Sequence, residues 1–189
     1  MMSSHHIVKE KQEPALYIHN LGNFDEEYLG QILEWSPTLI VNGNIYEKVI
    51  SLGLKVDIVV NGVDGLAPQE NTKSIIGPGD AYNTVLNYLI SEKYAAVNII
   101  DDEKKLSELD YYLPKINIVL FSSTEKSYAI KTGFKVWKPA GSIFLIDVVS
   151  YFEASNLMQK DEREFVVVKD GFVEFTFTTT EYVFLSEQL

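Results

Sequence analysis

Short apolar runs alternate with longer amphipathic stretches through the first two thirds of the chain. The apolar runs predict strands, and the amphipathic stretches predict helices. Strands are expected at 15–19, 38–41, 56–60, 95–100 and 116–121, and helices at 23–35, 45–52 and 104–112, with a further helix headed by Asp80. Because strands that alternate with helices of this length imply right-handed crossovers, the pattern predicts an α/β fold with a Rossmann-like, largely parallel sheet.

Two local signals refine these boundaries. Asn23, followed by Glu26 three residues later, has the form of a capping box that opens a helix, and Pro37 ends that helix near Trp35. Residues 61–78 form a polar segment rich in Gly, Pro and Asn. A loop of this length inside a compact domain indicates a functional role.

The pattern changes after Ser123, where strand-like runs dominate. These runs lie at 126–130, 134–138, 142–149, 164–177 and 181–185, and 148–159 is ambiguous between helix and strand. Asp170-Gly171 predicts a tight hairpin turn within the fourth run. The expected organisation is a disordered lead-in over 1–13, an α/β domain over 14–123, and a small antiparallel, sandwich-like β domain over 124–189.

Charge and composition exclude several classes of function. The net charge of −11 argues against a nucleic-acid partner, because phosphate backbones require clustered Lys and Arg. The chain has no cysteine, which excludes disulfides and thiolate chemistry. No apolar run approaches the roughly 18 residues of a membrane span, and residues 1–14 contain no apolar signal region. A cytoplasmic protein without a membrane partner is therefore expected.

Polar residues follow two neighbouring predicted strands. Asn42-Gly43-Asn44 comes after the second strand, and Asn61-Gly62 comes after the third, with Asp64 close behind. Side chains at the carboxyl ends of parallel strands face the ligand crevice of an open α/β sheet. Asp64 is in a position to ligate Mg²⁺ beside a phosphate ester, although Val63-Asp64-Gly65 is also a good turn sequence.

Asp80 follows Gly77-Pro78-Gly79 and admits three interpretations. It caps the helix that follows, or the glycines let the backbone approach an anion at the helix N-terminus. The segment is also similar to the Gly-Ala-Gly-Asp anion hole of ribokinase-like sugar kinases, in which the aspartate is the catalytic base. That base lies near the end of a much longer chain, so a sugar-kinase-like enzyme is a remote alternative. His19, which ends the first predicted strand, is expected to be a packed residue rather than an acid–base catalyst.

The motifs around the second and third strands resemble those of the thiamine pyrophosphokinase family. The matching segments are Asn42-Gly43-Asn44, Leu52-Gly53-Leu54-Lys55-Val56-Asp57, Asn61-Gly62-Val63-Asp64-Gly65 and Gly79-Asp80. The resemblance implies an α/β domain followed by a β-sandwich, a homodimer, and transfer of pyrophosphate from ATP to thiamine with Mg²⁺. It also implies that Asp64 and Asp80 are catalytic and hold the metal. Asn42, Gly43, Asn44, Asn61 and Gly62 would contact the substrates.

The chain departs from that family at the positions that carry charge. Asn42 replaces the first motif aspartate, and Asn61-Gly62 replaces a Gly-Asp pair. An acidic run, 101–108, stands where the family has Gly-Gly-Arg-x-Asp-His. Two interpretations follow, a divergent enzyme or a catalytically inactive homologue that binds a nucleotide or a thiamine-like ligand. Whether Asp101, Asp102 or Glu103 compensates for the lost carboxylates is left open by the sequence.

Overall fold

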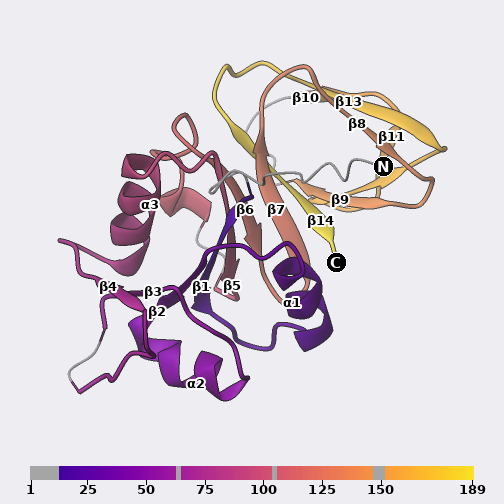
Figure 1. Cartoon of the computed structure of the whole chain (residues 1–189). Helices are drawn as coiled ribbons and strands as arrows, with labels where there is room; N and C mark the ends of the chain where they lie inside the picture. The colour runs from indigo at the N-terminus through magenta and orange to yellow at the C-terminus, as the bar shows by residue number, and fades with distance from the viewer. Residues whose placement is uncertain (1–12, 63–64, 104–105, 147–151) are drawn as a thin grey trace, which may run out of the picture.

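The computed structural model describes residues 13–62, 65–103, 106–146 and 152–189, which form one large mixed sheet, one small sheet and three α-helices (Figure 1). The first half supplies six parallel strands. They are β1 (Ala15–Asn20), β2 (Leu39–Asn42), β3 (Ile58–Val60), β4 (Lys73–Ile75), β5 (Ala96–Asp101) and β6 (Asn117–Phe121), in the spatial order β6-β5-β1-β2-β3-β4. Every neighbouring pair among them is parallel, as the alternating pattern predicts.

Helices cover both faces of this parallel part. On one face, α1 (Glu26–Leu33) and α2 (Tyr46–Ser51) bury Leu29 and Val49 against strand residues such as Leu16. On the other face, α3 (Ala81–Ser91) buries Leu86 and Leu89. Short 3₁₀ turns, η1 (Gly43–Ile45) and η2 (Leu106–Glu108), complete this half. The alternating sequence therefore folds into a doubly wound sheet with two apolar cores.

The direction of winding reverses at β1. The chain runs outward from β1 through β2, β3 and β4, and then returns to place β5 on the other side of β1. In open α/β sheets, ligands bind outside the carboxyl ends of the strands at such a reversal. The fold thus directs attention to the carboxyl ends of β1 and β5.

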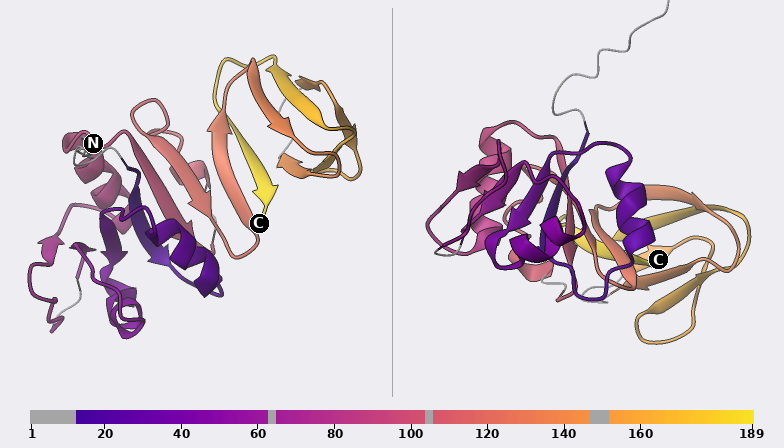
Figure 2. Two further views of the ribbon diagram at one scale, coloured as in Figure 1. Left: turned by 45° about the vertical axis from the view of Figure 1, so that its right-hand side comes forward. Right: turned by 60° about the horizontal axis from the view of Figure 1, so that its bottom comes forward.

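The second half extends the same sheet with antiparallel strands and folds a small sheet over its end (Figure 2). Its strands are β7 (Glu125–Ile130), β8 (Phe134–Lys138), β9 (Ile143–Ile146), β10 (Phe152–Ala154), β11 (Leu157–Gln159), β12 (Glu164–Val167), β13 (Gly171–Phe177) and β14 (Val183–Gln188). β7 pairs antiparallel with β6, and β10, β13 and β8 form the small sheet. The two layers enclose Phe144, Phe175 and Leu185, which confirms the predicted sandwich-like part.

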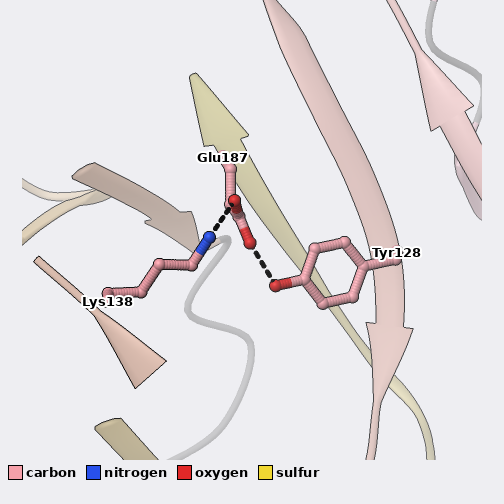
Figure 3. A network of polar contacts seen from close by, with 3 residues as sticks. All are labelled: Tyr128, Lys138 and Glu187. Carbon is pink, nitrogen blue, oxygen red and sulfur yellow. Dashed lines mark hydrogen bonds and ion pairs between the residues drawn. The ribbon is translucent and has the colours of Figure 1, made fainter. Parts of the chain in front are cut away.

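A partly buried ionic contact joins the two layers of the sandwich. Glu187 on β14 accepts hydrogen bonds of 2.5 Å from the Tyr128 hydroxyl on β7 and from Nζ of Lys138 on β8 (Figure 3). Burial by itself would raise the pKa of Glu187, but the hydrogen bonds from Lys138 and Tyr128, with Lys126 nearby, hold this pKa below its ordinary value. The charged form of Glu187 is therefore the form that the fold stabilises.

Several sequence-based boundaries were wrong. The cap of α1 is Asp25, whose Oδ1 accepts the Tyr28 N–H at 2.8 Å, and not Asn23. The helix ends at Leu33 instead of Trp35. The loop predicted over 61–78 contains β4, which pairs with β3. In the described part of 104–112, a single 3₁₀ turn replaces the expected helix.

The predicted hairpin at Asp170-Gly171 is also wrong. β12 pairs with β9 and β11, whereas β13 pairs with β8 and β10 in the other sheet. Val167 and Val173, on either side of the turn, both enter the sandwich core, so the chain crosses between layers there. Asp170 stabilises this corner by accepting the Ala140 N–H at 2.7 Å. A tight-turn sequence thus reverses the chain without pairing its two arms.

The ambiguous segment 148–159 contains strands β10 and β11 where it is described, and residues 147–151 lie outside the described part. The predicted lead-in, 1–13, lies outside it except for Glu13. In the residues that are described, no helix is long and apolar enough to cross a membrane.

Candidate functional site

The carboxyl ends of β1, β2, β3 and β5 form a polar edge, here called the rim. It consists of the last residues of these strands and those that follow: His19 and Asn20 of β1, Asn42–Asn44 from the end of β2, Asn61–Gly62 after β3, and Asp101–Glu103 from the end of β5. The N-terminus of α3, capped by Asp80, follows the return from β4. Asp64 lies outside the described residues, so its predicted role as a catalytic residue and metal ligand stays a prediction.

Asn42 is a structural link between β2 and β1. Its side chain is only 8% exposed, its Oδ1 accepts the Asn44 N–H at 3.4 Å, and its Nδ2 donates to the His19 carbonyl at 3.4 Å. Asn44 itself is exposed on the first turn of η1. The amide of Asn42 thus caps a turn.

Asn61 is held in a similar way. Its backbone has a φ of +48°, its N–H donates to the Ile75 carbonyl at 2.9 Å, and its Oδ1 accepts the Gly77 N–H at 3.3 Å. Gly43 lies directly against this segment, because a Cβ on Gly43 would be 2.6 Å from both the Asn61 carbonyl oxygen and the Gly62 Cα. The tertiary structure therefore brings the two predicted motifs, 42–44 and 61–62, into direct contact.

Asp80 is an exposed helix cap. Its Oδ1 accepts the Asn83 N–H at 2.7 Å, and its carbonyl oxygen accepts the Thr84 hydroxyl at 3.0 Å. The capping interpretation of Asp80 therefore describes its contacts. Its role as a catalytic residue or metal ligand stays a prediction.

A buried cluster that the sequence did not single out lies at the winding reversal. Asp101, with no exposed surface, ends β5 and accepts a 2.5 Å hydrogen bond from the Tyr82 hydroxyl on α3. The ring of Tyr82 packs on His19 with centroids 4.4 Å apart. His19 Nδ1 lies 2.9 Å from the Tyr17 hydroxyl on β1. The cluster joins β1, β5 and α3 around one carboxylate.

The electrostatics of this cluster keep both phenols protonated. Burial, followed by the charges of Asp101 and Asp80, raises the pKa of Tyr17. Burial, followed by the hydrogen bond to Asp101, raises the pKa of Tyr82. A phenol that stays protonated is a hydrogen-bond donor, so Tyr82 donates to Asp101 and Tyr17 is able to donate to His19. His19 is a packed residue, as predicted, and it packs at the carboxyl end of β1.

The other acidic residues after β5 are also held by the fold. Asp102 accepts the Ser123 N–H at 3.1 Å, and hydrogen bonds from the side chain and backbone of Ser123 lower the pKa of Asp102. Gly22 allows this approach, because a Cβ there would collide with the carboxylate of Asp102. The Glu103 N–H donates to Asp101 Oδ1 at 3.1 Å. The acidic run therefore fastens β5 to the loops after β1 and β6.

These contacts do not make a magnesium site from the described residues alone. Within 13–62, 65–103, 106–146 and 152–189, no group of three or more His, Asp or Glu side chains is arranged to hold a metal ion. The amide oxygens of Asn42 and Asn61 accept backbone N–H groups and carry no charge. Mg²⁺ prefers carboxylates together with substrate phosphates. The described residues by themselves thus do not supply the set of carboxylates that Mg²⁺ prefers.

The architecture defines a class of proteins, in which a doubly wound α/β sheet continues into a β-sandwich and carries polar residues at the strand ends beside its winding reversal. Solved structures of thiamine pyrophosphokinases share this fold. The chain is similar to the enzyme from Geobacillus thermodenitrificans with a TM-score of 0.69 and 8% identity, over 94% of this chain and 98% of that one. The likeness to the Bacillus subtilis enzyme has a TM-score of 0.65 and 10% identity, over 93% and 99%.

A eukaryotic structure gives the same result. The yeast thiamin pyrophosphokinase matches with a TM-score of 0.64 and 10% identity, over 96% of this chain and 87% of that one. No profile of a known protein family and no curated protein sequence matches the chain. At this low identity the likeness establishes the fold. It therefore confirms the resemblance carried by the motifs as a resemblance of fold. The parallel part ends with β6 at Phe121, which removes the support for a sugar-kinase-like enzyme.

Proposed function

We propose that this chain is a divergent thiamine pyrophosphokinase-like protein that binds a nucleotide or a thiamine-like ligand at the rim. The observation that carries the proposal is the contact of Gly43 with Asn61 and Gly62. This contact unites the two motif loops at the carboxyl ends of β2 and β3, in a fold that matches thiamine pyrophosphokinases over nearly its whole length. A crevice formed by such loops is where α/β sheets bind their ligands.

Binding is the function that the geometry supports best. Asn44 is exposed on its turn, and α3 directs the N–H groups of its first turn toward the same end of the sheet. Helix N-termini favour anionic groups such as phosphates. The carboxylates of Asp101 and Asp102 accept hydrogen bonds from the protein itself. A nucleotide would therefore be held by backbone N–H groups and amides.

Pyrophosphate transfer is the second candidate, favoured by the fold shared with enzymes that carry that name. In this reaction ATP and thiamine give thiamine diphosphate and AMP. The thiamine hydroxyl attacks the β-phosphorus of ATP, the bond from that phosphorus to the α-phosphate oxygen breaks, and the hydroxyl proton is released. Transfer of this kind depends on positioning and on neutralisation of charge. Asp64 and Asp80 are the carboxylates proposed to act with Mg²⁺. Together they would position the ATP phosphates and neutralise their charge.

One assay on the full chain separates the two candidates. The purified protein is incubated with thiamine, ATP and Mg²⁺, and AMP, thiamine diphosphate and the melting temperature are measured. A ligand at about 100 times its Kd stabilises the protein by about 2.7 kcal/mol, which raises Tm by about 5–10 °C. A rise in melting temperature with ATP or thiamine, with no formation of AMP, supports binding alone.

The remaining outcomes decide the other cases. Turnover that Asp64→Ala abolishes, and that the exposed sandwich variant Asp161→Ala retains, supports transfer and overturns binding alone. A melting temperature unchanged by ATP, AMP and thiamine, without product, overturns both candidates. The proposal extends to a cytoplasmic homodimer, which size-exclusion chromatography and cell fractionation test.

A further inference from the structure

Asn98 is a polar residue in an apolar part of the sheet. It lies on β5 between Leu16 of β1 and Val119 of β6, on the face that α1 covers. The side chain is half-buried, and within the described part of the chain its amide has no hydrogen-bond partner. Among the described residues no fully buried polar side-chain atom lacks a partner, so the Asn98 amide is open to solvent. It is therefore able to form hydrogen bonds with a group from outside the chain.

Two hollows reach Asn98 from different sides. The first, of about 430 Å³, lies beside α1 and includes Tyr28 and Trp35. The second, of about 470 Å³, includes Tyr128 and Asn117. It lies where β6 and β7 separate, because their ladder extends only over Val119–Phe121 and Lys126–Tyr128. We call these two hollows, both of which Asn98 lines, the Asn98 groove.

Aromatic rings line this groove. Trp35, just beyond the end of α1, is 71% exposed. Tyr28 contacts Phe121 with ring centroids 5.9 Å apart, and Phe121 lines the second hollow together with Tyr128. Pockets of about 300–1,000 Å³ with aromatic walls and a few polar groups are typical of small-molecule sites. The walls suit a planar ring, and the single amide suits a ring with a polar edge.

We propose that the Asn98 groove binds an amino-substituted nitrogen heterocycle, such as adenine or an aminopyrimidine. The Asn98 carboxamide accepts a hydrogen bond from the amino group and donates one to the adjacent ring nitrogen. The same paired contact is how Asn side chains recognise adenine in nucleic acids. Aromatic side chains such as Trp35 and Tyr28 offer faces on which the ring stacks.

This site is separate from the rim and does not depend on the proposed function. Asn98 precedes Asp101 by three residues, which places it about 10 Å back along β5. The first hollow includes Pro14 and Pro37, which precede β1 and β2, so it opens toward the amino ends of the strands. A ligand in the groove therefore lies away from the strand ends that form the rim.

The test uses Trp35 as a local reporter in the full chain. Trp137→Phe removes the other tryptophan, which is on β8. Fluorescence is then titrated with free adenine, with 4-aminopyrimidine, and with purine, which lacks the amino group. We expect saturable changes with the first two and binding at least about tenfold weaker for purine, since one good hydrogen-bonded pair is worth about that factor.

Asn98→Leu in the same background separates ligand recognition from folding. We expect it to weaken adenine binding at least about tenfold while changing Tm by less than about 2 °C, because the half-buried Asn98 amide has no hydrogen-bond partner in the described part of the chain. Gln188→Leu, at an exposed amide on β14 that lines neither hollow, is the matched control and should leave the Kd for adenine within about twofold. A loss of folding in Asn98→Leu would overturn the proposal, because it would show that the amide is needed by the fold.

Other results would also overturn it. These are an absence of saturable change up to the solubility limits of adenine and 4-aminopyrimidine, an equal affinity for purine, or an unchanged Kd in Asn98→Leu. None of these results bears on the rim, whose assay with ATP and thiamine gives its own outcome.

Discussion

The Tyr82 hydroxyl donates a 2.5 Å hydrogen bond to the carboxylate of Asp101, and this contact joins the first turn of α3 to the end of β5. Asp101 has no exposed surface. The contact lies beside β1, at the winding reversal of the sheet. It therefore fixes the position of the N-terminus of α3 relative to the end of β5.

Tyr82→Phe should destabilise the protein by about 1–3 kcal/mol, because it leaves one oxygen of a buried carboxylate without its donor. The loss is measured as the change in free energy of unfolding by urea at neutral pH. Tyr111→Phe, at a tyrosine that is 68% exposed, is the matched control and should change stability by less than about 0.5 kcal/mol. Equal effects of the two substitutions would show that the Tyr82–Asp101 contact adds nothing to stability.

Gly43→Ala should destabilise by about 1–3 kcal/mol, since the added Cβ would be 2.6 Å from backbone atoms of Asn61 and Gly62 that have little freedom to move. Gly30→Ala has the opposite expectation. Gly30 lies within α1 with no atom within 4 Å of an added Cβ, so the alanine should stabilise by about 0.5–1 kcal/mol. Thermal unfolding of both variants measures whether each substitution lowers or raises the stability. A Gly43→Ala variant as stable as the native protein would refute the close contact of the motif loops.

Lys138→Met should destabilise by about 1–3 kcal/mol at neutral pH, because Glu187 loses a charged hydrogen-bond donor. Lys135→Met is the control, since the Lys135–Glu174 pair is 3.7 Å apart with both side chains about half exposed, and it should lose less than about 1 kcal/mol.

The pH dependence of this contact has a definite sign. The folded pKa of Glu187 is lowered from its ordinary value of 4.5, so the stabilisation is present above pH 4.5 and is lost as the pH falls through the folded pKa. The difference in unfolding free energy between the native protein and Lys138→Met should therefore shrink below pH 4.5. Urea titrations at several pH values measure it, and a difference independent of pH would contradict the ionic assignment.

Asp80→Ala separates capping from ligand binding. Loss of the cap of α3 should cost about 1 kcal/mol, and Asp25→Ala, which removes the equivalent cap of α1, should cost the same. If Asp80 also takes part in the rim, Asp80→Ala should change the Tm shift caused by ATP, whereas Asp25→Ala should not. Identical ATP shifts in the two variants would remove Asp80 from the binding site and leave it as a cap.

Local sequence signals predicted the helices and strands well where burial alone determines the residue pattern of the element. The apolar runs that became β2 and β3 were recognisable because strands buried on both faces require apolar residues throughout, and β1, β5 and β6 because most of their residues are buried and most are apolar. The hairpin at Asp170-Gly171 failed because a turn sequence specifies a reversal but not the partner of each arm. β4 was missed because its residues, Lys73–Ile75, are exposed or only half-buried, and the edge of a sheet imposes little apolar pattern.

In the candidate site, too, some features were predictable from the sequence and others depend on tertiary contacts. Spacing alone placed Asn42 and Asn61 at the ends of adjacent strands, because parallel strands present their carboxyl ends at one edge. The contacts of these asparagines with backbone N–H groups, the approach of Gly43 to Asn61, and the Tyr82–Asp101 hydrogen bond all join residues distant in sequence. Periodicity in a sequence records which side of each element is buried and therefore determined the class of fold. Only the tertiary structure decided which polar groups satisfy one another, because that depends on distances across strands and helices that no local pattern encodes.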